Sequence, residues 1–215
     1  MILALETVRR TCSACVLGDD GCVVALRIGG EAEHDAAALL DALIRAHGRP
    51  RALAVAVGPG SFTGLRVAVV AVRTCAWVDE LPVHAVDALT ARAVAAGSGL
   101  WWVLQPLKRD TTHHALVRVG GDGAPEILDA TTASLDAAPP VLRPEHAAAV
   151  AIGPALAEKP GLAERWGAQR LGEATGLDAL GVARAARWTP AVAWRDLRPA
   201  YHQEAAPVLQ RGAGR

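Results

Sequence analysis

The sequence has no excess of charge of either sign. Its 215 residues contain 22 Lys and Arg against 22 Asp and Glu, so the formal net charge is zero. A protein that binds nucleic acid on its own usually carries a basic excess, because it must neutralise phosphates. We therefore expect this chain not to bind RNA directly by itself. Lysine occurs only at Lys108 and Lys159, which we interpret as compositional bias of the genome.

Long hydrophobic runs are also missing. No apolar stretch approaches the roughly 18 residues that a membrane span requires. Met1 leads directly into the strand-length run Ile2–Leu5, without the charged start of a signal peptide. We expect a cytoplasmic protein that makes no membrane contact. Hydrophobic residues make up 52% and charged residues 20%, which is typical of a folded chain with one large or two small domains.

Motifs for metal binding and catalysis are absent as well. Cys12 and Cys15 have the C-x-x-C spacing, but no second such pair or histidine pair completes a zinc site. On a strand, residues three apart face opposite sides, as do the adjacent His113 and His114. The chain has no H-E-x-x-H and no G-x-S-x-G motif. We expect structural thiols, no metal site and no catalytic residues.

Hydrophobic patterning predicts strands that alternate with helices. After a hairpin at 18–21, the pattern becomes helical and then strand-like in turn. The Gly97-Ser98-Gly99 stretch is the predicted domain boundary, and residues 120–147 show no clear periodicity. The predicted strands are 2–6, 11–17, 22–28, 52–57, 82–86, 100–104, 114–119 and 150–153, and the predicted helices are 34–47, 62–78, 87–96 and 177–188.

The stretch VAVGPGSFTGLRVA, residues 55–68, joins a buried strand to a helix through a glycine-rich loop. It is not a Walker loop, because Leu65-Arg66 stands where Lys-Ser/Thr is required. Nor is it a Rossmann fingerprint, because one residue too many precedes Gly64. Two interpretations stay open. The loop could hold an anion at the helix N-terminus, or it could be a capped corner whose glycines permit close packing.

Two further features bear on function. The helix predicted for 62–78 is apolar all round, so it must be covered on two sides. Its sheet can cover one side, and the other needs a second helix or another subunit. Glu6-Thr7 ends the first strand, where actin-like ATPases hold metal and phosphate. The bulky Val8-Arg9-Arg10 that follows is not a phosphate-binding turn, so we interpret Glu6 and Thr7 as a degenerate phosphate loop.

These residues resemble the bacterial TsaB (YeaZ) family, formerly labelled glycoprotease. The resemblance rests on GPGSFTGLR at 58–66, ILALET at 2–7, Glu33-His34 with Leu39-Leu40, ELPVHAV at 80–86 and Pro199-Ala-Tyr201. Departures from the family pattern mark a divergent member. They are Glu6 for Asp, Ala68 for Gly, Pro106-Leu-Lys108 for Asp-Ala-Arg, and His-Gln after Tyr201.

The resemblance implies an α/β protein with the actin-like ATPase superfamily fold, in which two ribonuclease-H-like halves have mixed β-sheets flanked by helices. It implies an N-terminal domain, 1–98, that carries the partner-binding helices, and a smaller, divergent C-terminal domain, 99–215. The implied function is that of a non-catalytic subunit of the TsaD-containing complex, which installs threonylcarbamoyl on adenosine 37 of ANN-decoding tRNAs. The alternatives are a divergent ATP-binding protein or kinase of the superfamily and, last, a peptidase.

The resemblance also implies partners and sites. The partners are a TsaD-like catalytic subunit and a TsaE-like ATPase, with tRNA contacted only through the complex. In isolation we expect a homodimer. No cofactor is expected for the chain by itself, and ATP and magnesium belong to the complex. The signature loop comprises Gly58, Pro59, Gly60, Ser61, Phe62, Thr63, Gly64 and Arg66. The expected partner interface comprises His34, Leu40, Ile44, Leu65, Val69 and Val72.

Overall fold

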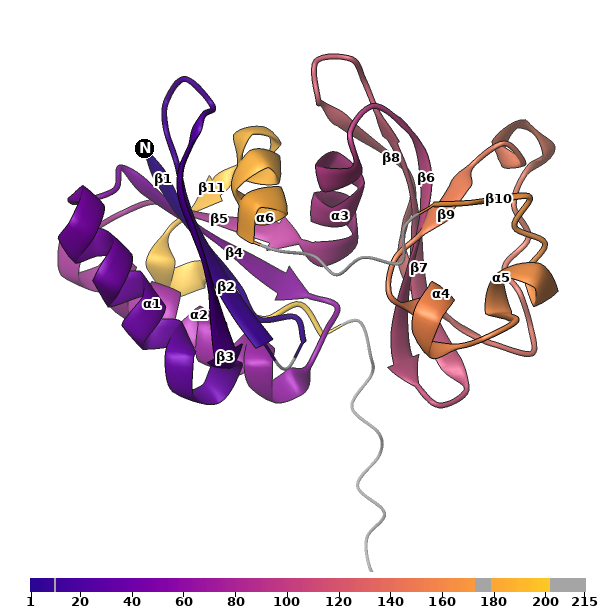
Figure 1. The fold of residues 1–215 in the computed structure, drawn as a ribbon, viewed down its shortest axis with the longest axis horizontal. Coiled ribbons are helices and arrows are strands. Elements are labelled where there is room, and N and C mark those ends of the chain that lie inside the picture. Colours follow the sequence, from indigo (N-terminus) through magenta and orange to yellow (C-terminus); the bar gives the residue numbers. More distant parts are fainter. Residues whose placement is uncertain (10, 173–178, 202–215) are drawn as a thin grey trace, which may run out of the picture.

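Two β-sheets face each other across a layer of helices (Figure 1). The computed structural model describes residues 1–9, 11–172 and 179–201, and for residues 32–34 and 145 it describes the backbone alone. None of the described helices has the length and apolar character that crossing a bilayer requires.

The first sheet is mixed and has the strand order β11-β5-β4-β1-β2-β3. β1 is antiparallel to β2 and parallel to β4, which in turn runs parallel to β5. The short β11 pairs antiparallel to β5 at the edge. The bounds are β1 Ile2–Glu6, β2 Thr11–Leu17, β3 Val23–Glu31, β4 Ala52–Gly58, β5 Val83–Asp87 and β11 Ala191–Val192.

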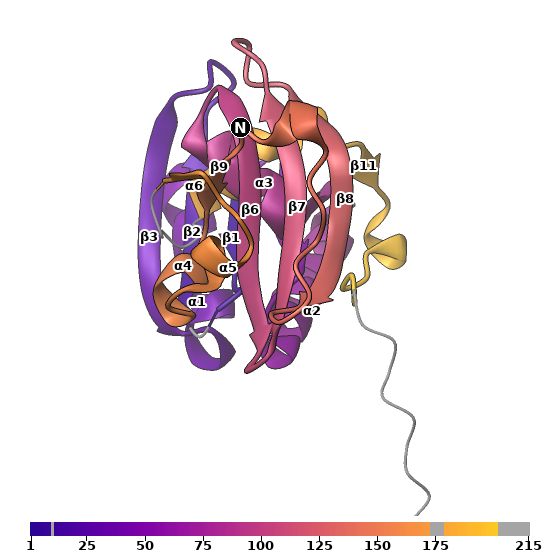
Figure 2. The same cartoon turned by 90° about the vertical axis from the view of Figure 1, so that its right-hand side faces the viewer.

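The second sheet is also mixed, with the order β10-β9-β6-β7-β8. β6, β7 and β8 form an antiparallel meander, and β9 runs parallel to both β6 and β10. Figure 2 looks onto the outer face of this sheet, with two short helices in front of it. The bounds are β6 Gly99–Lys108, β7 Thr111–Val119, β8 Pro125–Leu135, β9 Val150–Ile152 and β10 Arg170–Leu171.

The helices form three layers around the sheets (Figures 1 and 2). α1 (Ala32–His47) and α2 (Phe62–Asp79) cover the outer face of the first sheet, and α3 (Ala88–Ala96) and α6 (Ala179–Ala185) lie between the sheets. α4 (Ala155–Glu158) and α5 (Leu162–Arg165) cover the outer face of the second sheet. Short 3-10 helices span Pro144–His146, Ala186–Trp188 and Trp194–Asp196.

Residue size decides which face of the first sheet receives which helices. Successive strand residues point to opposite faces. In β1, Leu3 and Leu5 therefore pack with α1 and α2, whereas Ala4 faces the layer of α3 and α6. β4 repeats this pattern, with Leu53 and Val55 on the outer face and alanines on the inner one. The leucine-rich face is thus committed to α1 and α2.

The structure differs from the predicted elements at several places, among them β6 and β7, which are longer than predicted, and α4, α5 and β10, which the patterns do not predict. β3 continues beyond the predicted strand end at residue 28, because its residues keep their pairing with β2 up to Glu31. β8 was not predicted, since this edge strand is largely exposed and shows no apolar alternation. α6 and β11 follow residue 98 but pack on and pair with the first sheet, so the two sheets do not correspond to two continuous stretches. Residues 177 and 178 of the predicted last helix lie outside the described residues.

Candidate functional site

The signature loop turns the chain from β4 into α2 at a point where other segments approach closely. Gly58 has φ +136°, a conformation that favours glycine. A Cβ on Gly58 would lie 2.6 Å from the carbonyl oxygen of Ala200. The backbone N–H of Ala200 donates to the carbonyl of Val57 at 2.8 Å. The loop is therefore closed on one side by the segment that follows β11.

The end of β1 closes the other side of the loop. A Cβ on Gly60 would lie 2.7 Å from the carbonyl oxygen of Val8, and one on Gly64 would lie 2.3 Å from that of Thr7. The Thr7 hydroxyl donates to the carbonyl of Gly64 at 2.9 Å. These glycines are needed because no side chain fits between the loop and residues 7 and 8.

Donor groups at the start of α2 are directed to protein acceptors. The N–H of Ser61 donates to the carbonyl of Val8 at 2.8 Å, and the N–H of Gly64 donates to the Ser61 hydroxyl at 3.3 Å, the usual N-cap bond. An anion that bound the N–H of Ser61 or Gly64 would have to displace these bonds. Of the two interpretations that the sequence leaves open, the geometry favours the capped corner.

Glu6 is buried and bound to its own chain. Its carboxylate accepts from the N–H of Val8 at 2.5 Å and from the Ser13 hydroxyl at 3.3 Å. The same hydroxyl accepts from the N–H of Ala179 at the start of α6. Glu6 thus ties β1, β2 and α6 together.

A buried arginine lies near Glu6, in the layer between the sheets. Arg92 of α3 donates to Gln105 of β6 at 3.1 Å. Burial lowers the pKa of Arg92 to about 10, against the opposing effect of the Glu6 charge. No cluster of metal-ligating side chains is found in the described part of the chain. The Glu6 carboxylate and the Thr7 hydroxyl are both hydrogen-bonded within the chain.

The C-x-x-C cysteines are buried in β2 as free thiols. Burial raises the pKa of Cys12, and the charges of Asp35 and Glu6 add to this effect. A raised pKa keeps a thiol protonated and weakly nucleophilic. This environment agrees with the prediction that the thiols are structural.

Most of the predicted interface residues lie in the core. Leu40, Leu65, Val69 and Val72 are at most 3% exposed, so the prediction that they form the partner surface is wrong. Leu40, Val69 and Val72 pack on the outer face of the first sheet, and Leu65 packs in the core on its inner face. Ile44 is half-buried at the edge of the helix pair. The side chain of His34 lies outside the described residues.

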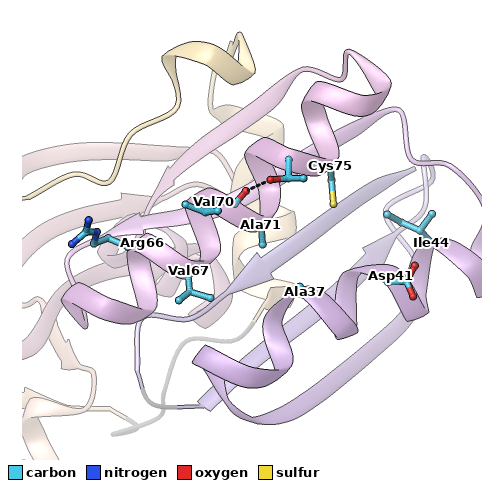
Figure 3. A pocket seen from close by; sticks show the side chains of 9 residues that line it. Ala37, Asp41, Ile44, Arg66, Val67, Val70, Ala71 and Cys75 are labelled. Atoms are coloured by element: carbon cyan, nitrogen blue, oxygen red, sulfur yellow. Dashed lines mark hydrogen bonds between the residues drawn. The ribbon is translucent and has the colours of Figure 1, made fainter.

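On the side that faces solvent, a groove runs between α1 and α2 (Figure 3). Its volume is about 530 Å³, and Val70, which is 62% exposed, lies on its α2 side. Most of its lining is apolar, and Asp41 is paired with Arg45. The lining residues are Ala37, Asp41, Ile44, Arg66, Val67, Val70, Ala71, Thr74 and Cys75.

Aromatic side chains extend this surface along α2. Near its N-terminus Phe62, 57% exposed, stacks on Tyr201 at 5.2 Å and lies under the Arg66 guanidinium at 5.1 Å. Near its C-terminus Trp77, 60% exposed, contacts Trp194 at 6.4 Å. We call the exposed residues Phe62, Arg66, Val70, Thr74 and Trp77 the outer stripe of α2.

The helical spacing of the outer stripe is visible in the sequence. Its members are spaced by four, four, four and three residues, as expected for one face of a helix. A second apolar stripe, which includes Leu65, Val69, Val72 and Ala76, has the same periodicity and is buried. Because the outer stripe also carries Phe62, Val70 and Trp77, apolar periodicity alone could not tell which stripe faces the sheet.

Two mixed sheets, flanked by helices and joined by a central helix layer, make this an α/β protein with the fold of the actin-like ATPase superfamily. The predicted fold class is confirmed. The particular form of the fold is that of YeaZ. A structure described as YeaZ from Pseudomonas aeruginosa superposes with a TM-score of 0.79 at 20% identity, covering 93% of this chain and 98% of that one.

Two other solved structures have the same general fold. A Pseudomonas aeruginosa protein described as similar to peptidase YEAZ gives a TM-score of 0.79 at 21% identity, covering 94% of this chain and 99% of that one. The ethanolamine utilization protein EutJ from Carboxydothermus hydrogenoformans gives 0.50 at 14% identity, covering 85% and 88%. The predicted resemblance to TsaB (YeaZ) is thus confirmed in the fold.

Sequence comparison gives one family match. The profile of the family "TsaD: tRNA N6-adenosine threonylcarbamoyltransferase" matches residues 37–107, which run from α1 through the signature loop and α2 into β6. No curated protein gives a significant match to the sequence.

Proposed function

We propose that this chain is a TsaB-type, non-catalytic subunit that pairs with a TsaD-like enzyme in the threonylcarbamoylation of adenosine 37 in ANN-decoding tRNAs. The YeaZ fold and the TsaD family match over residues 37–107 support this proposal. In this role the protein acts in the cytoplasm. It contacts tRNA only through the complex.

The exposed surface of α1 and α2 carries the proposal. Contiguous apolar surface on a monomer marks an interaction site when it is larger than a few isolated side chains. Here the groove and the outer stripe of α2 offer apolar and aromatic groups over the length of an 18-residue helix. Two neighbouring helices that run in the same direction, with a groove between them, fit a second helix pair, which would give a four-helix contact. The same surface would form a homodimer when the partner is absent.

The proposal that the chain is non-catalytic is supported by the hydrogen bonds of Glu6 and Thr7. Both are hydrogen-bonded within the chain, and the start of α2 is capped by Ser61. A kinase of this superfamily would need these groups for magnesium and phosphate. The peptidase alternative would need a nucleophile beside a base or a metal cluster, and the described residues hold no such cluster. ATP and magnesium would then belong to the TsaE-like ATPase and the complex.

Reconstitution with the TsaD and TsaE proteins of the same organism tests the proposal. The three proteins are combined with ATP, magnesium, the threonylcarbamoyl donor and an ANN-decoding tRNA, and modified nucleoside is measured by mass spectrometry. We expect a stable complex with TsaD in size-exclusion chromatography, and modification that depends on this chain. Failure to form a complex at micromolar concentration, or full modification without this chain, would overturn the proposal.

A further inference from the structure

A second cavity lies in the other half of the molecule, on the outer face of the second sheet. Its volume is about 340 Å³, within the range of small-molecule sites. Because α1 and α2 cover the outer face of the other sheet, this cavity is separate from the proposed partner surface (Figure 1). Its lining residues are Trp102, Pro139, Pro140, Val141, Leu142, Ala147, Ala149, Arg165, Trp166, Gly167 and Ala168.

Two stacked tryptophans form part of the cavity wall. The rings of Trp102 and Trp166 lie 5.7 Å apart at 27°, and His114 meets Trp166 edge-on at 5.6 Å. The indole N–H of Trp166 donates to the carbonyl of Asp136 at 3.1 Å. The indole N–H of Trp102 is buried and has no hydrogen-bond acceptor among the described residues. Such a donor is rare in native proteins, where a ligand or water usually satisfies it.

A buried ion pair holds the base of the cavity wall in place. The carboxylate of Asp136 accepts from the Thr112 hydroxyl at 2.8 Å and from Lys159 at 2.7 Å. Lys159 also donates to the carbonyl of Thr111 at 2.7 Å. Asp136 directly precedes the segment 137–142, which supplies the prolines and Leu142 of the wall. The cavity is therefore built on a fixed frame.

The lining indicates the chemistry of an occupant. Indole rings, prolines and Leu142 favour a flat apolar ring. Among the described side chains of the lining, Arg165 alone is charged, and it is exposed and forms no ion pair with any described residue. Guanidinium groups bind carboxylates through charge-assisted hydrogen bonds.

We propose that this cavity binds a small aromatic carboxylate. The ring packs against Trp166, which covers the fully buried Trp102, and against the prolines, and the carboxylate reaches Arg165. This site is independent of the proposed function, because its residues lie apart from the surface of α1 and α2. If the chain did not bind TsaD, the proposed carboxylate site would be unaffected. If the cavity did not bind an aromatic carboxylate, the proposed binding to TsaD would be unaffected.

Nuclear magnetic resonance on the full ¹⁵N-labelled chain tests the site with indole-3-acetate as the probe. The chain has six tryptophans, so the indole N–H region holds few signals, and Trp102→Phe and Trp166→Phe assign the two that matter. We expect the Trp102 and Trp166 signals to shift saturably, with a Kd of about 1 mM or tighter. No saturable shift of either signal up to about 20 mM probe would overturn the proposal.

A matched pair of arginine variants tests the carboxylate contact. Arg165→Gln should weaken binding of indole-3-acetate by about fivefold or more, since a charge-assisted bond is lost. Arg109→Gln, at an exposed turn outside the cavity, should bind like the unmodified chain. The neutral probe indole-3-acetamide should bind equally to both variants. Unchanged affinity of Arg165→Gln for the acid would contradict the proposed orientation.

Discussion

Thr7 and Gly64 contact each other through both their backbones and a side chain. The Thr7 hydroxyl donates to the carbonyl oxygen of Gly64 at 2.9 Å, and the carbonyl of Thr7 lies 2.3 Å from where a Cβ of residue 64 would be. The end of β1 is thereby fixed against the first turn of α2. This contact gives the GPGSFTG loop a structural purpose, because it sets the position of the helix whose other side is exposed.

Gly64→Ala should destabilise the protein by about 3 kcal/mol, because the new methyl group must push the backbone of Thr7 away. Urea unfolding followed by circular dichroism measures this change. Gly121→Ala is the matched control, since a Cβ there meets nothing within 4 Å, and its effect should stay within about 0.5 kcal/mol. Equal stability of the two variants would show that the loop does not pack as described.

Lys159→Met should cost about 3 kcal/mol of unfolding free energy, because it leaves the carboxylate of Asp136 buried without its cation. The control is Arg118→Met, which breaks the exposed pair with Glu126 and should change stability by less than about 1 kcal/mol. Both are measured by urea unfolding at neutral pH. If the two substitutions had similar effects, the Lys159–Asp136 pair would not be structural.

His114 should make stability fall as the pH becomes acidic. Burial lowers the pKa of His114, and the nearby Asp129 charge offsets this only in part. As the pH falls, the unfolded chain therefore binds the proton first. The stability contribution is complete above the ordinary histidine pKa of about 6.5 and is lost as the pH falls towards the lower pKa of the folded state. Urea midpoints over this range should fall less for His114→Gln than for the unmodified chain; identical slopes would contradict this.

Magnesium-ATP should produce no saturable heat with the isolated chain in titration calorimetry at nucleotide concentrations up to about 1 mM. The reason is that Glu6, Thr7 and Ser61 already bond within the chain. Binding that disappears in Glu6→Gln would instead support the kinase alternative.

Local patterns predicted much of the first sheet and its helices. The predicted strands 2–6 and 11–17 have the observed bounds, and the predicted helix 62–78 is observed as Phe62–Asp79. Here apolar periodicity agrees with clear caps, such as Ser61 at the start of α2 and Gly48 after α1. The sequence does not predict β8, because an exposed edge strand needs no apolar alternation.

The site was harder to predict because it depends on contacts between distant segments. The need for Gly58 and Gly64 arises from Ala200 and Thr7, which local patterns do not connect to the loop. The sequence does predict that α2 has more apolar surface than its own sheet can cover. Assigning Leu65 and Val69 to the partner surface failed, because only the position of the sheet decides which stripe is buried.

The affinity of Val70→Asp for the TsaD protein of the same organism tests the proposed partner surface. Val70 lies exposed on the groove, so a carboxylate there should be tolerated by the fold and rejected by an apolar partner surface. Ile127→Asp, at a 56% exposed position on β8 in the other half, is the matched control. Thermal unfolding first establishes that both variants fold.

Titration calorimetry with TsaD then compares the two variants with the unmodified chain. We expect Val70→Asp to weaken binding by about 100-fold or more, and Ile127→Asp to bind like the unmodified chain. A folded Val70→Asp that binds TsaD with unchanged affinity would contradict it.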